Sequence, residues 1–191
     1  MPLRKSRHLS NRLKKQLGST LIEVLITMVL VAIGILTTLG MQINNKEALY
    51  DSVQRTTAAQ LAHDLSERLR SNRDARDVYV AAGTVGGSTL TLSTCTSAAP
   101  CTPAGMAALD LYEWEQMLDG ASEAGTGGLV NPQGCITGPA AGGAGQYTIA
   151  IAWRGVKELS DPTASNCGAG SGLYGGNNEF RRVLIFTLFL A

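Results

Sequence analysis

The chain has 191 residues, enough for one domain of ordinary size, and 16 basic against 15 acidic residues give a net charge of +1. The charge is unevenly placed, because the first 18 residues hold six basic side chains and no acidic one. The rest of the chain is mildly acidic, which gives no reason to expect nucleic acid as a partner.

An uncharged apolar run follows this basic N-terminal stretch, from residue 24 to residue 43. As a helix it is about 30 Å long, which matches the hydrocarbon core of a bilayer. A cleaved secretory signal would have a shorter apolar stretch and a small-x-small cleavage site, and residues 39–43 offer no such site. The run therefore predicts a membrane anchor, with its basic end held on the cytoplasmic side.

A single carboxylate, Glu23, directly precedes the run, and Gly18 lies five residues before it. A charged side chain at the edge of an apolar helix is costly to place in lipid and tends to mark a partner. Taken alone, Glu23 is explained equally well as an acid at the level of the lipid headgroups. Gly18 at this spacing favours a more specialised segment than a plain anchor.

Residues 18–25, with the sequence GSTLIEVL, resemble the class III signal of type IV prepilins. In that family the leader is cut after the glycine, and a glutamate occupies the fifth position of the mature chain. The resemblance implies that a prepilin peptidase cuts between Gly18 and Ser19, that Ser19 becomes N-methylated, and that Glu23 docks the subunit in a filament. Ser19 departs from the phenylalanine that the family usually carries there.

A long helix is predicted to continue well beyond the apolar run. Apolar residues recur at steps of three and four from residue 48 to residue 69, with no proline between them. We expect a removed leader at 1–18, a transmembrane and filament-core half-helix at 19–44, and an amphipathic half at 45–72. A periplasmic head is expected at 73–191, and Gly34 and Gly40 are the expected soft points of the helix.

The end of the long helix is rich in arginine, at positions 68, 70, 73 and 76. Acidic residues are interleaved with these arginines and no aromatic residue lies among them. This composition favours a solvated helix end over a nucleic-acid patch.

The remainder of the chain is rich in Gly, Ala, Ser and Thr and contains four predicted elements. They are a short strand at 89–93, a helix at 103–118 with proline near its start and glycine past its end, and strands at 147–153 and 183–190. A long helix followed by short strands predicts an α+β fold: a long N-terminal α-helix packed against a small antiparallel β-sheet head with Gly-rich loops.

All four cysteines lie beyond the apolar run, and none forms a Cys-x-x-Cys pair. An even number on the exported side predicts two disulfides in an oxidising compartment. Three pairings are possible. Joining sequence neighbours is favoured because it costs least chain entropy, which gives Cys95–Cys101 and Cys135–Cys167. The longer loop should then contribute about 3–4 kcal/mol of stability.

Three head segments resemble minor pilins of the V type, the type IV pilus modification protein family. They are Glu-Arg-x-Arg-x-Asn at 67–72, Asp-Leu-x-x-Trp at 110–114, and Tyr-x-Ile-x-Ile-x-Trp at 147–153 between cysteines. The resemblance implies a low-abundance subunit that primes pilus assembly, first in the inner membrane and then in an extracellular pilus. Whether that pilus serves adhesion, twitching motility or DNA uptake stays open. Its implied partners are other minor pilins, the major pilin, the prepilin peptidase and a large tip adhesin.

Two alternatives stay open. A minor pseudopilin of a type II secretion system shares the leader and the long helix. A single-pass periplasmic binding module would instead need a cluster of ligand-binding side chains, and the sequence shows none.

Catalytic, metal and cofactor sites are not predicted. With two histidines and no Asp-x-Asp-x-Asp loop, neither a zinc nor a calcium site is supported. Residues 170–175 match G-x-G-x-x-G, but that pattern binds nucleotide only between a strand and a helix N-terminus, and here it leads into a strand. The acids of the 103–118 helix (Asp110, Glu113, Glu115 and Asp119) are expected to form a wetted face.

Overall fold

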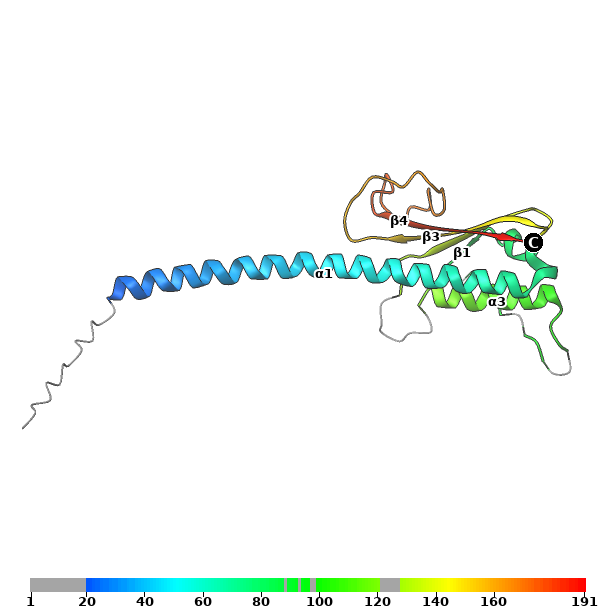
Figure 1. The fold of residues 1–191 in the computed structure, drawn as a ribbon, viewed down its shortest axis with the longest axis horizontal. Helices are drawn as coiled ribbons and strands as arrows, with labels where there is room; N and C mark the ends of the chain where they lie inside the picture. The colour runs from blue at the N-terminus through cyan, green and yellow to red at the C-terminus, as the bar shows by residue number, and fades with distance from the viewer. Residues whose placement is uncertain (1–19, 88, 93, 97–98, 121–127) are drawn as a thin grey trace, which may run out of the picture. The chain divides into compact units, whose positions relative to one another are not determined.

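A computed structural model describes residues 20–87, 89–92, 94–96, 99–120 and 128–191 (Figure 1). The elements in chain order are α1 (Leu21–Ser71), the 3-10 turn η1 (Arg73–Ala75), α2 (Arg76–Ala81), β1 (Thr84–Val85), α3 (Pro103–Leu118), β2 (Gln133–Thr137), β3 (Gly145–Arg154) and β4 (Arg181–Leu190). The chain divides into two compact units, residues 1–45 and 46–191, which are described separately below.

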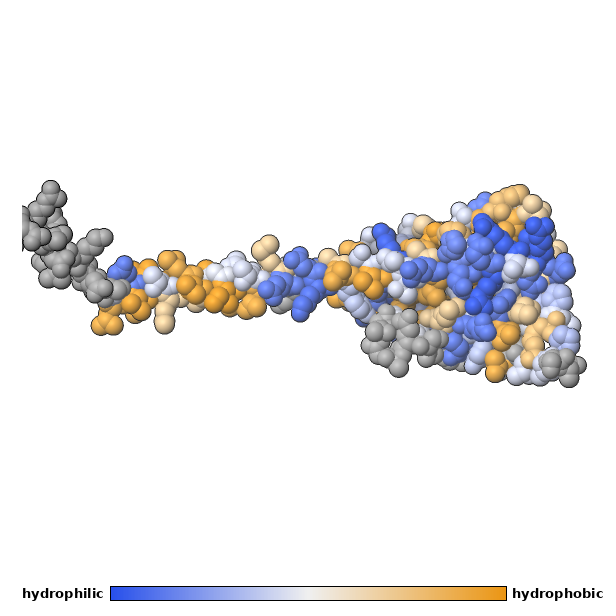
Figure 2. Space-filling view, turned by 60° about the horizontal axis from the view of Figure 1, so that its bottom comes forward, coloured by the Kyte–Doolittle hydropathy of each residue, from blue (hydrophilic) through white to orange (hydrophobic). Residues whose placement is uncertain are grey.

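In the first unit, the described residues form the beginning of α1, whose apolar side chains are exposed from Leu21 to Met41 (Figure 2). The hydroxyls of Thr27, Thr37 and Thr38 donate to backbone carbonyls three or four residues earlier, over 2.6–2.8 Å. This bonding satisfies their polar atoms within an apolar helix. The helix is continuous through Gly34 and Gly40, the expected soft points.

The second unit is built on a four-stranded sheet in the order β1-β2-β3-β4, with every neighbouring pair antiparallel. The remaining part of α1 and α3 cover one face of this sheet (Figure 1). Alternate residues of β3, among them Ile149, Ile151 and Trp153, are buried in the same core as Ala58 and Leu65 of α1. The α+β fold expected from the sequence is therefore confirmed.

The predicted helix at 103–118 is α3, with the same bounds. Thr102 caps its N-terminus, where the side-chain oxygen accepts from the backbone N–H of Gly105 at 3.1 Å, and Pro103 occupies the first turn. Trp114 is buried, and its indole Nε1 donates to the backbone oxygen of Leu61 on α1 at 2.9 Å. This bond ties α3 to α1 across 53 residues of sequence.

The strand predicted at 89–93 is wrong for the residues that the structure describes there. Thr89 and Leu90 donate their backbone N–H groups to the carboxylate of Glu115 and not to a neighbouring strand. The sheet begins instead with β1, and it also contains β2, a strand that the sequence did not predict. β2 carries a glycine and a cysteine where strong strand formers are usual, so its pattern is weak.

Candidate assembly site

Both expected processing residues, Gly18 and Ser19, lie outside the described residues. The described chain begins at Thr20, whose backbone oxygen accepts from the N–H groups of Glu23 at 2.9 Å and Val24 at 3.2 Å. These bonds form the first turn of α1. Glu23 is therefore placed where the positive end of the helix dipole stabilises a carboxylate.

The surroundings of Glu23 on α1 are apolar and exposed. Leu21 is 91% exposed and Leu25 is 65% exposed. Within the described part of the chain, α1 is long and apolar enough to cross a bilayer. A carboxylate in such a helix favours a cationic partner once lipid or protein surrounds it.

In the second unit, an ion-pair cluster joins α1 to α3. The guanidinium of Arg68 donates to Asp64 of α1 and to Asp110 and Glu113 of α3, each at 2.9 Å. The hydroxyl of Tyr79 on α2 donates to the second oxygen of Asp110. Burial lowers the pKa of Arg68, but its bonds to Glu113, Asp64 and Asp110 outweigh burial and raise the pKa above its ordinary value.

The expectation of a solvated helix end is therefore wrong for two of its four arginines. Arg68 is paired as described, and Arg76 is buried, with bonds to the backbone oxygens of Leu69 and Ala191. Arg70 does fit the expectation, because it is half exposed and pairs with Glu67 one turn earlier.

The wetted acidic face expected on α3 is wrong for Glu115, although Glu113 is exposed as expected. Glu115 is fully buried, and its carboxylate accepts from the backbone N–H groups of Gly86, Thr89 and Leu90 and from the hydroxyl of Thr89, over 2.8–3.2 Å. Asp119, one turn later, accepts from the N–H of Gly87. The two acids hold the loop after β1 in place.

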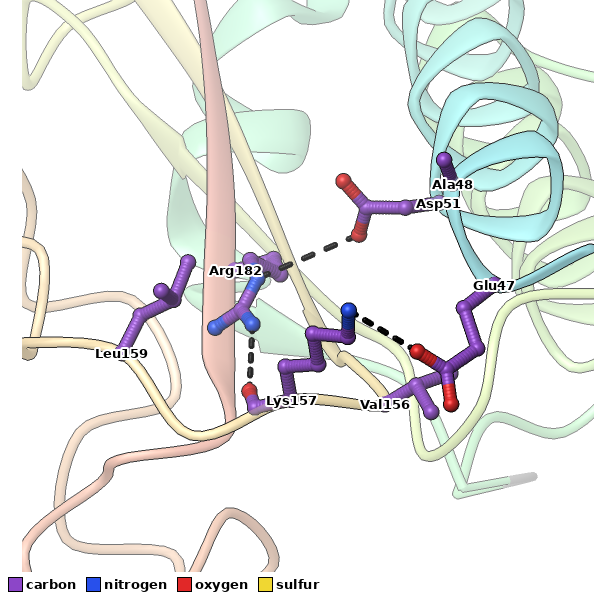
Figure 3. A pocket seen from close by; sticks show the side chains of 7 residues that line it. All are labelled: Glu47, Ala48, Asp51, Val156, Lys157, Leu159 and Arg182. Atoms are coloured by element: carbon purple, nitrogen blue, oxygen red, sulfur yellow. Dashed lines mark hydrogen bonds and ion pairs between the residues drawn. The ribbon is translucent and has the colours of Figure 1, made fainter. Parts of the chain in front are cut away.

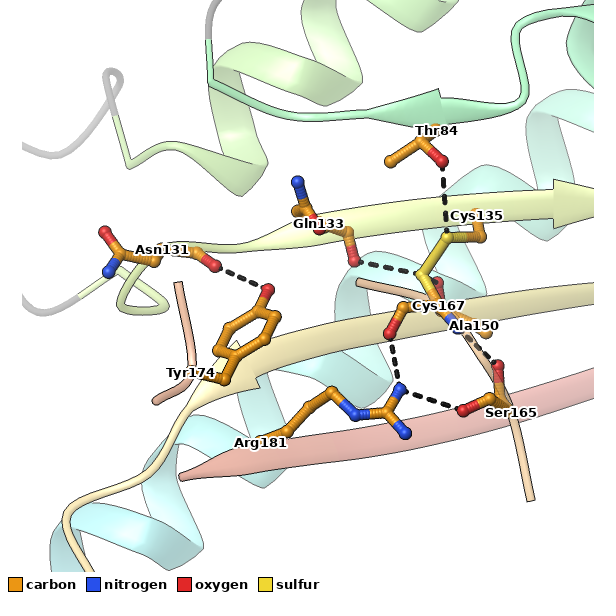
Figure 4. The surroundings of a disulfide bond; sticks show 9 residues. All are labelled: Thr84, Asn131, Gln133, Cys135, Ala150, Ser165, Cys167, Tyr174 and Arg181. Carbon is orange, nitrogen blue, oxygen red and sulfur yellow. Dashed lines mark hydrogen bonds between the residues drawn. A yellow bond between two sulfur atoms is a disulfide. The ribbon is translucent and has the colours of Figure 1, made fainter. Parts of the chain in front are cut away.

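A disulfide fastens the long connection between β3 and β4 to the sheet (Figure 4). The structure joins Cys135 of β2 to Cys167, with Cα atoms 5.7 Å apart, and Cys95 to Cys101, which is the pairing favoured from the sequence. Beside the first bridge, buried Arg181 donates to the backbone oxygens of Ser165 and Cys167 at 2.8 and 2.7 Å. Arg181 also pairs with Asp161 at 2.7 Å.

A cavity of about 210 Å³ lies between α1 and the loop after β3 (Figure 3). Its charged side chains face one another: Lys157 pairs with Glu47 at 2.9 Å, and Nε of Arg182 lies 3.9 Å from Asp51. Arg182 also donates to the backbone oxygen of Lys157. These pairings hold the loop against the helix.

Across the described residues, no group of three or more His, Cys, Asp or Glu side chains could hold a metal ion. Residues 170–175 form turns that lead into β4, so the G-x-G-x-x-G pattern does not stand before a helix.

A long N-terminal helix packed on a four-stranded antiparallel sheet is the α+β fold of pilins, and the comparisons with known proteins agree. The family described as type IV pilin Tt1218 matches residues 40–112. The prokaryotic N-terminal methylation motif matches residues 13–39, which include Gly18, Ser19 and Glu23. No curated protein and no solved structure gave a match.

The chain is a type IV pilin-like protein with a class III prepilin leader. Proteins of this family are structural and not enzymatic. A prepilin leader implies a prepilin peptidase and pilus components as partners, and the apolar helix is consistent with residence in the inner membrane and later in a pilus.

Proposed function

We propose that this chain is a minor type IV pilin of the V type, which joins other low-abundance pilins to prime pilus assembly and is incorporated in the pilus or at its tip. One observation carries the proposal. Glu23 stands in the first turn of an exposed apolar helix, five residues after Gly18 and within the matched N-terminal methylation motif.

The physical role of Glu23 follows from the cut between Gly18 and Ser19. Cleavage there removes the basic leader, residues 1–18, and leaves the whole apolar helix on the product. The new cationic amine of Ser19 is available to the Glu23 carboxylate of a neighbouring subunit. In an apolar helical bundle this pair fixes the register, because a misplaced carboxylate would stay buried without its partner.

The apolar half-helix would then exchange lipid for protein. Residues 24–43 do not enter water unaided, because exposing an apolar side chain costs about 1.5–3 kcal/mol. In the proposed filament, residues 19–44 lie in the core, 45–72 connect to the head, and 73–191 form the head. Before assembly, the proposed surroundings are those of the inner membrane. In the pilus, the proposed neighbours are other minor pilins, the major pilin and a tip adhesin.

The V-type assignment is supported by two of the three head motifs, at 67–72 and 110–114, because their residues are in contact with each other. Arg68 of the first motif bonds to Asp110 of the second, and Asn72 of the first donates to the backbone oxygen of Pro103 at 2.8 Å. The indole of Trp114, in the second motif, donates to the backbone oxygen of Leu61 on α1. The motifs therefore describe how the long helix is fixed to the head.

Two substitutions test the proposal in cells. Gly18→Val should leave an uncut precursor of higher mass, and normal processing of this variant would contradict the leader assignment. Glu23→Ala should be processed normally but fail to enter filaments, whereas Glu158→Ala, at an exposed head position, should behave as wild type. Incorporation of the Glu23 variant at the wild-type level would remove the docking role.

A further inference from the structure

The edge of the sheet formed by β4 is long and unprotected. Residues 183–190 contain no glycine, proline or charged side chain. Their backbone forms hydrogen bonds only with β3, as far as the described residues go. Sheet edges are normally kept short, charged, bulged or covered, because their open N–H and C=O groups recruit other strands. The opposite edge, β1, is only two residues long.

The side chains on the outer face of β4 match this open edge. Phe189 is 73% exposed and Ile185 is 39% exposed, with exposed Thr187 between them. The alternate residues Leu188 and Leu190 face the core and are buried. The open end of β4 thus presents an apolar, uncharged surface beside unpaired backbone groups, the combination that binds an extended strand.

We propose that the β4 edge binds, by strand addition, the first edge strand of the head of a different pilin-like subunit. This inference rests on the proposed function, because it takes the subunits to be filament neighbours. Subunits of a filament are related by rotation and translation and contact one another head to tail. Their heads therefore point the same way, which excludes a two-fold pairing of β4 with β4 of a copy.

The strand directions in the sheet determine which strand of a neighbouring subunit can pair with β4. Each neighbouring pair from β1 to β4 is antiparallel, so β1 runs opposite to β4. The first edge strand of a neighbour that points the same way therefore meets β4 in the antiparallel direction and extends the sheet. This chain's own β1, Thr84–Val85, pairs through only two residues, so a second copy would leave most of β4 open.

A contact through one strand buries little surface. It is therefore better suited to a neighbouring subunit in the same filament than to a protein that binds from solution. Stable complexes between free proteins bury about 800 Å² per partner, more than one added strand is expected to supply. Subunits already joined through their apolar helices are at high effective concentration, so a weak second contact suffices to select the correct neighbour. The expected partner strand is uncharged, with apolar side chains at alternate positions.

Photo-crosslinking in cells that make the complete pilus machinery tests the contact directly. The full chain carries p-benzoylphenylalanine in place of Phe189, or in place of Leu92, an exposed loop residue 55% accessible, as the control. We expect an adduct from position 189 whose peptides map to an edge strand of another subunit with a prepilin leader, and no such adduct from position 92. An adduct with a second copy or with lipid, or the absence of any protein adduct, would overturn the proposal.

A charged edge provides the second test. The double variant Ile185→Lys and Phe189→Lys should lower co-purification with the other pilin subunits by about tenfold, because lysine on an edge blocks strand addition. It should still be processed and melt like Leu92→Lys. Undiminished co-purification would overturn this inference alone. An unprocessed wild-type chain would instead overturn the proposed function.

Discussion

Arg68 of α1 and Asp110 of α3 form an ion pair, with Nη1 and Oδ1 2.9 Å apart, across 42 residues of sequence. Only 20% of the Arg68 side chain and 14% of the Asp110 side chain are exposed. Because Asp110 also accepts from Tyr79 of α2, this carboxylate joins three helices. The long helix is thus fixed to the head by charge-assisted bonds as well as by apolar packing.

Removing the arginine should loosen this joint. Arg68→Ala leaves three carboxylates close together without their cation, so we expect a loss of about 2–3 kcal/mol in the free energy of unfolding. Arg70→Ala is the matched control, because Arg70 is half exposed and forms one pair within its own helix. The control should change stability by less than about 0.5 kcal/mol. Urea unfolding of the detergent-solubilised chain measures both, and equal effects would contradict the joint.

Gly134 of β2 should tolerate no side chain. A Cβ at this position would overlap the ring of Trp114, which is buried and bonded to α1. Gly134→Ala should therefore cost about 3 kcal/mol through overpacking. Gly176→Ala is the control, since nothing lies near a Cβ there. Thermal melting compares the two variants, and a Gly134 variant as stable as the control would refute this packing.

Acid should weaken the hold of Glu115 on the loop after β1. Burial raises the pKa of this carboxyl, but its bonds from Leu90, Thr89 and Gly86 outweigh burial and lower the pKa below 4.5. The unfolded chain then takes up the proton first as the pH falls. The stabilisation is present above pH 4.5 and is lost below it.

Glu115→Gln tests this assignment. It should lower stability by about 1.5–3 kcal/mol at pH 7, because charged acceptors bond more strongly than amides. The variant should also lose less stability than wild type between neutral and acid pH. Parallel acid curves for the two proteins would show that Glu115 is not the group responsible.

Alkali should destabilise the head through Tyr174. Burial raises the pKa of Tyr174 from 10.0 to about 12, only partly offset by Arg181. From pH 10 upward the unfolded chain releases this proton while the folded chain keeps it, so stability falls as the pH rises. Tyr174→Phe should make the decline shallower, although it loses the bond to Asn131 and about 1 kcal/mol at pH 7. Urea unfolding at pH 8–11 in the absence of thiols measures the slope; an unchanged slope would contradict the assignment.

The elements that sequence reasoning predicted are those with strong local signals. The helix α3 has a capping threonine and a proline at its start, and β3 and β4 carry long apolar patterns. The spacing of Gly18 and Glu23 is contained within six residues and lies in the matched methylation motif, while the roles of the two residues stay predictions. Pairing neighbouring cysteines was favoured because short loops cost least entropy.

What the sequence did not predict depends on contacts between distant residues. The charge of Glu115 suggested a wetted face, but the folded chain brings three backbone N–H groups to it from residues 86–90. Arg68 likewise found its partners 42 and 45 residues away. β2 was missed because it contains Gly134, and glycine is rare in strands. The glycine is needed because a Cβ there would overlap the ring of Trp114, a contact that the sequence does not reveal.

The mass of the mature chain's N-terminal peptide is the most direct measurement. We expect a chain purified from membranes or pili to begin at Ser19 and to carry one additional methyl group on its amine. A chain that begins at Met1, or at any residue other than Ser19, would lack the amine that Glu23 is proposed to pair with. That result would contradict the filament role.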